Sequence, residues 1–279
     1  MGLPYLINCS ILFTELPLEQ RPAAARAAGF DAVEFWWPFP AALPGDAEAD
    51  RFVRAVRDAG VRLVGLNFFA GDMPAGDRGV VSWPGREREF ADAVDVAVGI
   101  GEQLGVAGFN ALYGNRIDDV PAAKQDELAT ANLAHAAAAA ARIGATVLVE
   151  PVSGAPRYPL RTAEDALAVV DRVAAGNTAG NTAENVRLLA DLYHLTVNGD
   201  DVDAVIAAHT PRIGHVQIAD APGRHEPGTG TTPLQAQLDA LEAAGYAGWV
   251  SLEYAPAGST VDGLSWLPAE RRGTTGGTS

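Results

Sequence analysis

The amino-acid sequence predicts a single-domain α/β protein with the (β/α)8 architecture of a TIM barrel. Strand-like and helix-like segments alternate about eight times along the chain, and no linker separates them. Such alternation produces a parallel sheet, which eight repeats close into a barrel. The length of 279 residues agrees, since barrels of about 250 residues are common. We expect the barrel to span residues 1–270, followed by a disordered Gly/Thr-rich tail at 271–279.

Each predicted strand is a short apolar run rich in β-branched or aromatic residues, as expected for strands that are buried on both faces. The eight runs cover residues 6–13, 31–37, 62–69, 106–113, 145–152, 186–193, 213–220 and 249–254.

Segments with helical periodicity lie between the strands. They cover residues 17–30, 47–60, 85–105, 121–144, 162–176, 200–209 and 232–245. Six glycines lie at or near helix ends, where a left-handed residue is common: Gly29, Gly60, Gly105, Gly144, Gly176 and Gly245. Thr162 and Asp165 have the spacing of a capping box, with Asp in place of the usual Glu.

An open, doubly wound sheet is the alternative architecture. That fold usually carries a glycine-rich phosphate-binding turn after its first strand, whereas residues 10–14 contain no glycine. The barrel is therefore favoured. The polar, nearly repetitive segment 176–183 is interpreted as a surface loop insertion without a chemical role.

The charge balance excludes some classes of partner. The chain has 20 Lys and Arg residues against 35 Asp and Glu residues, a net charge of −15 at pH 7. This balance opposes binding to nucleic acid or to an anionic membrane, because no basic surface is available to replace phosphate counterions. Cys9 is the only cysteine, so an intramolecular disulfide and a thiolate metal cluster are excluded. No export signal or long apolar segment is present, and we expect a cytoplasmic protein.

Four polar side chains follow or end consecutive predicted strands. Each of the last four apolar runs stops near one of them: Glu150, Asp191, Gln217 and Glu253. A carboxylate has no place in a buried strand unless it is paired or binds a metal, because its removal from water costs several kcal/mol or more. Helix capping or pairing with Arg is the alternative for any one of them. Because the carboxyl ends of parallel strands converge, four together predict a site.

The ligand atoms of this site would all be oxygens. Three carboxylates and one amide suit Mg²⁺ or Mn²⁺ better than Zn²⁺ or Cu²⁺. A divalent cation of this kind is the expected cofactor.

Other polar residues lie close to the same strand ends. His194, three residues after Asp191, is interpreted as a hydrogen-bonding group for a substrate oxygen, and Arg224 as the anchor for a carboxylate. His215 is expected to be a buried, hydrogen-bonded histidine one layer deeper, and Glu34 to support the site rather than to react. The Gly/Thr stretch 228–232 is a weak alternative signal for phosphate binding.

Several segments together resemble the hydroxypyruvate isomerase family of the xylose isomerase-like TIM barrel superfamily, over nearly the whole chain. The matching segments are 11–17, 23–38, 66–79, 84–90, 148–153, 191–194, 215–220, 222–230 and 252–254 with Pro256. The resemblance implies that Glu150, Asp191, Gln217 and Glu253 hold the metal, that the two glutamates transfer protons, and that His194 and Arg224 bind the substrate. The related ketose 3-epimerases carry His at the position of Gln217.

Three departures from the family pattern lie on the expected substrate rim. The family often has Glu after the GTG motif, Lys or Arg at 255 and Asn at 153, where this chain has Thr231-Thr232, Ala255 and Ser153. None affects the expected metal ligands, so the departures leave the substrate open rather than the reaction type.

The resemblance implies a metal-dependent isomerase that interconverts hydroxypyruvate and tartronate semialdehyde by glutamate-mediated proton transfer through an enediolate. A ketose 3-epimerase or a 2-oxo-tetronate isomerase would use the same residues. An apurinic endonuclease would need more histidines and a basic face, and a non-catalytic sugar-acid-binding protein would not need two acid/base groups. The expected partner is a small molecule, with no nucleic acid or membrane, and a homo-oligomer is compatible with the sequence.

Overall fold

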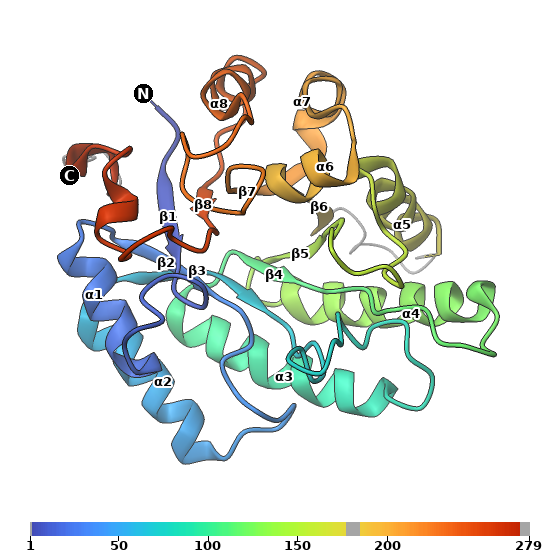
Figure 1. Cartoon of the computed structure of the whole chain (residues 1–279). Helices are drawn as coiled ribbons and strands as arrows, with labels where there is room; N and C mark the ends of the chain where they lie inside the picture. The colour runs from blue at the N-terminus through green and yellow to red at the C-terminus, as the bar shows by residue number, and fades with distance from the viewer. Residues whose placement is uncertain (1, 177–184, 274–279) are drawn as a thin grey trace.

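The computed structural model describes residues 2–176 and 185–273 and confirms the closed parallel barrel (Figure 1). Its strands are β1 (Tyr5–Asn8), β2 (Ala32–Phe35), β3 (Arg62–Asn67), β4 (Gly108–Asn110), β5 (Thr146–Val149), β6 (Val186–Asp191), β7 (Ile213–Ile218) and β8 (Val250–Leu252). They neighbour one another in chain order. The pairing of β1 with β8, which aligns Tyr5 with Val250 and Ile7 with Leu252, closes the barrel.

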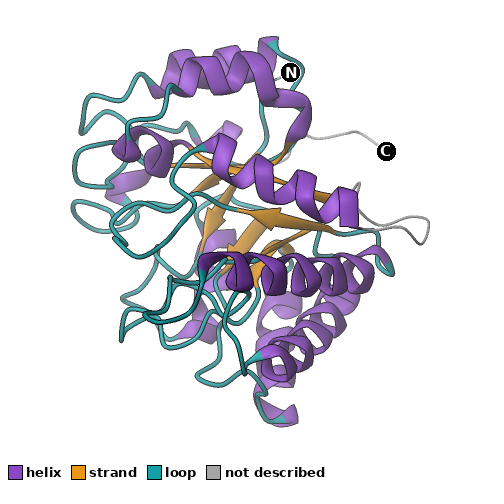
Figure 2. Cartoon of the chain, turned by 90° about the vertical axis from the view of Figure 1, so that its right-hand side faces the viewer, coloured by secondary structure: helices purple, strands orange, loops and turns teal. Residues whose placement is uncertain are grey.

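Helices follow the strands and cover the outside of the barrel (Figure 2). The α-helices are α1 (Arg21–Ala27), α2 (Asp46–Ala59), α3 (Glu87–Leu104), α4 (Ala122–Ala141), α5 (Ala163–Gly176), α6 (Leu192–Asn198), α7 (Val202–His209) and α8 (Leu234–Ala243). Short 3-10 helices are η1 (Leu18–Gln20), η3 (Thr210–Arg212), η4 (Asp262–Leu264) and η5 (Ala269–Arg271). None of the helices in the described part of the chain is long and apolar enough to cross a membrane.

The strands are shorter than the apolar runs that predicted them. The run 6–13, for example, leaves the sheet at Asn8, whose carbonyl accepts from the backbone N–H of Leu12 in a turn. Leu12, Phe13 and Phe69 are nevertheless buried in the main core. The sequence therefore stays apolar beyond the sheet, because these side chains after the strand ends still belong to the core.

Helix α6 was not predicted. The run 186–193 was interpreted as strand throughout, but β6 ends at Asp191, whose Oδ1 accepts hydrogen bonds from the backbone N–H groups of Tyr193 (2.8 Å) and His194 (3.2 Å). Asp191 is thus the N-cap of α6. The apolar spacing after it suits a short buried helix as well as a strand, which is why the pattern misled.

The predicted capping box and five of the six predicted helix-terminal glycines are confirmed. Thr162 and Asp165 form the reciprocal capping box, with the N–H of Thr162 3.0 Å from Asp165 Oδ2 and the N–H of Asp165 3.2 Å from Thr162 Oγ1. Five of the six predicted terminal glycines have positive φ, but Gly176 lies within α5. Residues 177–183 of the predicted loop insertion lie outside the described residues.

The end of the described chain contacts the barrel's outer layer. Arg272, which we assigned to the tail, donates to the carbonyl oxygens of Leu264 (2.7 Å), Leu267 (2.9 Å) and Ala28 (3.2 Å). Residues 274–279, the rest of that tail, lie outside the described residues.

The barrel interior has a polar layer above an apolar one. Leu6, Ala32 and Val64 form a small buried cluster against which Trp249 packs. Two positions further along β1 and β2, Asn8 and Glu34 follow the same inward alternation. Glu34 contacts His215 of β7 at 2.7 Å, and since β2 and β7 are not neighbours this contact crosses the interior. The polar layer therefore lies towards the carboxyl ends of the strands, where barrels of this kind hold their sites.

Candidate active site

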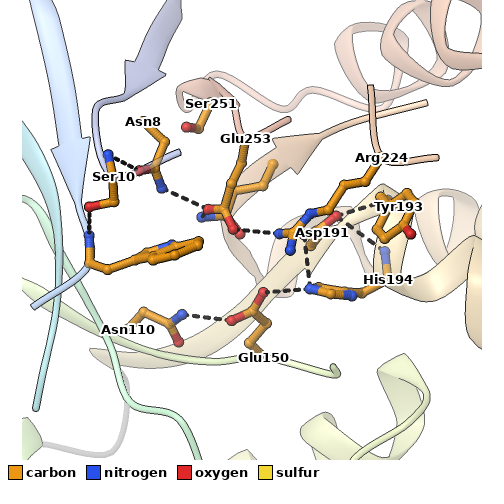
Figure 3. A network of polar contacts seen from close by, with 12 residues as sticks. Asn8, Ser10, Asn110, Glu150, Asp191, Tyr193, His194, Arg224, Ser251 and Glu253 are labelled. Atoms are coloured by element: carbon orange, nitrogen blue, oxygen red, sulfur yellow. Dashed lines mark hydrogen bonds and ion pairs between the residues drawn. The ribbon is translucent and has the colours of Figure 1, made fainter. Parts of the chain in front are cut away.

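The four predicted ligands lie at the same end of the barrel. Glu150 follows β5, Asp191 ends β6, Gln217 lies in β7 and Glu253 follows β8, and all four are buried. The carboxyl groups of Glu150 and Glu253 point into the same space from different sides of the barrel mouth (Figure 3). Sequence and structure agree on which side chains converge.

The amide of Gln217 is oriented by two carboxylates. Its Nε2 donates to Glu34 Oε1 (2.9 Å) and to Glu253 Oε2. Because both partners are acceptors, the nitrogen must face them, and the oxygen is turned away. Gln217 Oε1 is buried and has no hydrogen-bond partner among the described residues. A buried acceptor left in this state calls for a cation or another donor.

Asp191 shows the same feature. Its Oδ1 caps α6, whereas its Oδ2 is buried without a hydrogen-bond partner in the described chain. His194 Nε2 lies 3.5 Å from Asp191 Oδ2 and 4.0 Å from Glu150 Oε1. Glu150, Asp191 and His194 each offer a ligand atom within 4.8 Å of the others. The donor chemistry and the two buried oxygens that accept no hydrogen bond in the described chain, Asp191 Oδ2 and Gln217 Oε1, fit a hard divalent cation.

The tautomer of His194 excludes it from the ligand set. The backbone N–H of Ser153 donates to His194 Nδ1 at 3.0 Å, and Ser153 Oγ lies 2.7 Å from the same nitrogen. Nδ1 is therefore an acceptor, and the neutral ring carries its proton on Nε2, which faces Asp191 and Glu150. Nε2–H is a hydrogen-bond donor in this state and has no lone pair for a metal.

Arg224 contacts two of the predicted ligands. Its Nη2 lies 2.7 Å from Glu253 Oε1 and 3.6 Å from Asp191 Oδ2, and its guanidinium lies 5.4 Å from the ring centroid of Tyr193. The backbone of Arg224 is left-handed, with φ of 59°. This conformation costs about 1–3 kcal/mol in a non-glycine residue and is found mainly at functional sites.

Asp220 fixes the loop that carries Arg224. Its carboxylate accepts from the N–H groups of Gly228 (2.8 Å), Gly230 (2.9 Å) and Thr232 (3.0 Å). The suggestion that this Gly/Thr stretch binds phosphate is wrong, because Asp220 already occupies those N–H groups.

The two glutamates differ from ordinary carboxyl groups in their proton affinity. Burial, with the charge of Asp191, raises the pKa of Glu150 to about 8. Burial also raises the pKa of Glu253 well above its ordinary value, although Arg224 opposes the effect. Burial lowers the pKa of His194 to about 4 against the opposing charge of Asp191, with Arg224 and Arg78 adding to the decrease. Near pH 7 the site therefore combines carboxyl groups able to exchange protons with a neutral imidazole.

The strand ends of β1 and β4 supply residues that the sequence interpretation missed. Asn8 Nδ2 donates to Glu253 Oε2 (2.8 Å) and Glu34 Oε1 (2.9 Å), and Asn110 Nδ2 donates to Glu150 Oε2 (2.7 Å). A signal was available, since both asparagines interrupt apolar runs of the sequence, as the four predicted ligands do.

His215 is buried and hydrogen-bonded, as the sequence predicted, and its partner is the buried Glu34. Glu34 Oε2 lies 2.7 Å from His215 Nε2, and its Oε1 accepts from Ser251 Oγ at 2.6 Å as well as from Asn8 and Gln217. Burial would raise the pKa of Glu34, but the His215 charge and these hydrogen bonds outweigh burial and lower it. Glu34, held by His215, thus orients the amides of Asn8 and Gln217, which both donate to its Oε1.

A cavity of about 880 Å³ opens onto the site. Glu150, His194, Arg224 and Glu253 contribute to one part of its wall. Its other lining residues include four aromatic side chains from the loops after β2 and β3: Trp36, Trp37, Phe39 and Phe69. The cavity has room for a small molecule beside both glutamates.

The fold and this geometry agree with a known family, because the model of the xylose isomerase-like TIM barrel matches residues 22–270. The chain belongs to the xylose isomerase-like TIM barrel family. A Streptomyces coelicolor protein named "Putative hydroxypyruvate isomerase" is 53% identical over 95% of this chain and 96% of its own length. A Cupriavidus necator protein named 2-oxo-tetronate isomerase is 34% identical, covering 94% of this chain and 96% of the relative.

A crystal structure from Brucella melitensis, described as an AP endonuclease of family 2, superposes with a TM-score of 0.84. It is 34% identical and covers 95% of this chain and 98% of the other. The curated relatives are isomerases matched over nearly their full length, so this member of the xylose isomerase-like family is an enzyme of the isomerase class.

Proposed function

We propose that this enzyme interconverts hydroxypyruvate and tartronate semialdehyde. The observation that carries the proposal is the pair Glu150 and Glu253, two buried carboxyl groups of raised pKa that line one cavity from β5 and β8. Binding alone would not require two such groups, whereas moving a proton between adjacent carbons requires a base and an acid. The name of the Streptomyces relative supports the choice of substrate.

The two glutamates would divide the proton transfer between them. One removes a proton from C3 of hydroxypyruvate, which carries the hydroxyl group, and the other delivers a proton to C2. The hydroxyl proton moves from the C3 oxygen to the C2 oxygen, so that the ketone becomes an alcohol and C3 becomes an aldehyde. No atom is gained or lost, and no oxidant is needed.

We further propose that Glu150, Asp191, Gln217 and Glu253 hold a divalent cation, Mg²⁺ or Mn²⁺. Asp191 Oδ2 and Gln217 Oε1, which are buried and accept no hydrogen bond in the described chain, support this assignment. When bound, such a cation polarises the substrate carbonyl and stabilises negative charge on the adjacent oxygens.

The remaining polar groups would orient the substrate and the glutamates. His194 presents Nε2–H to a substrate oxygen, with its ring fixed by Ser153. Asn110 and Asn8 hold one oxygen each of Glu150 and Glu253, which leaves the other oxygen of Glu150 available, whereas that of Glu253 contacts Arg224. Arg224, in contact with Glu253 Oε1, is proposed as a second substrate contact next to that glutamate.

Exchange of substrate hydrogen with solvent tests this function. The protein is stripped of metal, then incubated with hydroxypyruvate in D₂O with Mg²⁺, Mn²⁺ or a chelator, and products are followed by NMR. We expect tartronate semialdehyde with deuterium at C2, activity that is lost with the chelator, and activity that returns with either cation. Full activity in metal-free protein would contradict the metal assignment, and absence of exchange at any metal load would contradict the isomerase.

A 2-oxo-tetronate is the second candidate substrate. The Cupriavidus relative carries that activity in its name, and a cavity of about 880 Å³ can hold one further carbon. Proton return to the same carbon would give a 3-epimerase instead, so the NMR assay includes 2-oxo-tetronate and neutral ketoses. Phosphodiester cleavage is disfavoured by the net charge of −15.

A further inference from the structure

A 2-oxo acid brings a carboxylate into the cavity, and a cation should receive it. Three arginines line the cavity: Arg78, Arg86 and Arg224. They differ in whether an acidic side chain already neutralises them. That difference decides which one is available to the substrate.

Arg224 and Arg86 are both paired. Arg224 Nη2 contacts Glu253 Oε1 at 2.7 Å, next to Asp191. Arg86 Nη2 donates to Glu89 Oε1 at 2.8 Å, its Nη1 lies 3.9 Å from Asp77 Oδ2, and its guanidinium lies 5.6 Å from the ring centroid of Trp83. At either arginine a substrate carboxylate would meet a guanidinium whose charge protein carboxylates already offset, although the buried Nε of Arg224 has no hydrogen-bond partner in the described chain.

Arg78 has no acidic partner within ion-pair distance among the residues that the structure describes. Its Nη1 donates to the carbonyl oxygens of Asp77 (2.7 Å) and Met73 (3.1 Å), which orients the guanidinium without neutralising its charge. In the described chain its Nε and Nη2 make no hydrogen bond. The side chain is half-buried and lines the same cavity as His194 and the two glutamates.

The backbone holds Arg78 in place on both sides. Its carbonyl accepts from the N–H of Gly114 and the N–H of Gly79 donates to Ala70, both at 2.9 Å. Gly79 has φ of 102°, and a Cβ there would lie 1.8 Å from the carbonyl oxygen of Leu112. The loop after β3 is thus packed directly against the segment after β4. A fixed guanidinium loses little conformational entropy on binding a carboxylate.

We propose that Arg78 binds the carboxylate of the substrate and so selects 2-oxo acids over neutral hydroxy-ketones. The proposal rests on the proposed function, since it places the hydroxy-carbonyl end of the same substrate at Glu150 and Glu253. Arg224 then contacts the reacting end beside Glu253, and its pairing with that glutamate explains why a second arginine is needed. Arg78 is a specificity residue and takes no part in proton transfer.

Kinetics of Arg78→Gln, Arg78→Lys and Arg224→Gln, all loaded with Mn²⁺, separate these roles. We expect Arg78→Gln to raise KM for hydroxypyruvate about 30-fold or more with a smaller effect on kcat, because it removes a charge-assisted pair made in the ground state and the transition state alike. Arg78→Lys keeps the positive charge, so its KM should lie between those of wild type and Arg78→Gln. Arg224→Gln should act mainly on kcat. Arg88→Gln, whose side chain on α3 is 94% exposed, is the control and should match wild type.

Calorimetric binding of D-glycerate and of neutral glycerol to the same proteins gives a readout that is independent of turnover. Arg78→Gln should lose affinity for glycerate by a similar factor and keep its affinity for Mn²⁺. If Arg78→Gln bound glycerate as tightly as wild type and kept the wild-type KM, the assignment would be overturned. The same would follow if only Arg224→Gln bound glycerate more weakly and had a raised KM. A wild-type enzyme inactive on hydroxypyruvate would contradict the proposed function instead, while glycerate binding would still test Arg78.

Discussion

The two halves of the barrel mouth differ in chemistry although they share one architecture. Strands β1, β3 and β4 end on the amides Asn8, Asn67 and Asn110. In the second half, β6 ends on Asp191, while β5 is followed by Glu150 and β8 by Glu253. The first half supplies hydrogen-bond donors, and the second half supplies carboxylates that need them. Amides of the first half thus orient the proposed acid/base groups of the second half, together with Gln217 and Arg224 from the second half itself.

This division leaves one carboxyl oxygen of Glu150 without a hydrogen bond among the described residues, whereas both oxygens of Glu253 have partners. Asn110 donates to Glu150 Oε2, and the other oxygen of Glu150 accepts no hydrogen bond in the described chain, whereas Asn8 donates to Glu253 Oε2 and Arg224 contacts Glu253 Oε1. An asparagine can fix a carboxyl group without neutralising it, which an arginine cannot do. The first half therefore sets geometry and leaves the proton affinity of the second half high.

The largest expected effect tests whether the second half performs the chemistry. Glu150→Gln and Glu253→Gln should each reduce kcat by about 10²–10⁴-fold or more, since each loses an acid/base group and a proposed metal ligand. The change is isosteric, so thermal melting should stay close to wild type. A variant that kept about a tenth of wild-type turnover, measured by the NMR assay, would remove that glutamate from the mechanism.

Asp191→Asn separates metal binding from folding. Asn keeps the Oδ1 acceptor that caps α6 but loses the charge at Oδ2. We expect the affinity for Mn²⁺ to fall at least about 10-fold in calorimetric titration, with little change in Tm of the metal-free protein. Equal metal affinity in variant and wild type would exclude Asp191 from the ligand set.

Metal binding should release protons. The pKa of Glu150 is raised to about 8, so at pH 7 the folded, metal-free protein holds a proton there that the unfolded chain, with a pKa of about 4.3, has lost. This group's contribution to the free energy of unfolding is full below about pH 4.3 and is lost as pH rises through about 8.

A cation requires the ionised form, so its affinity should increase with pH over the same window. Titrations at pH 7 in two buffers of different ionisation enthalpy should show proton release on Mn²⁺ binding. Binding without proton release would contradict the raised pKa.

Glu34→Gln tests the buried contact between Glu34 and His215 beneath the site. It removes the charge that pairs with His215, and we expect the free energy of unfolding to fall by about 1–3 kcal/mol at pH 7 in urea denaturation. The pKa of Glu34 is lowered, so its stabilising charge is present above about pH 4.3 and is lost in acid. The difference from wild type should therefore shrink as pH falls below that value. Glu102→Gln, at an exposed position of α3, should show no such loss.

The smallest effect is expected for Ser153→Ala. The backbone N–H of residue 153 still donates to His194 Nδ1, so the tautomer is kept and only the Oγ contact is lost. We expect kcat/KM to fall by at most about fivefold. A much larger loss would show that the hydroxyl has a role of its own in the site.

The sequence by itself determined the barrel and predicted the acidic half of the candidate site. Alternating strand and helix patterns can close only as a parallel sheet, and polar residues at the ends of buried strands stand out because nothing else justifies them there. Glu150, Asp191, Gln217 and Glu253 were found in this way, together with the neighbouring His194 and Arg224.

Only the tertiary structure decided which atoms are free. That Gln217 Oε1 is unpaired, that His194 carries its proton on Nε2 and that Asp220 occupies the N–H groups of its loop depend on partners 8 to 183 residues away in the chain. The same holds for Arg78, whose lack of an acidic partner in the described chain separates it from Arg86 and Arg224. Residue type fixes what a side chain can bind. Closure of the barrel determines which groups come within bonding distance of it, because these groups are far apart in the chain and their separation in space cannot be read from either sequence position.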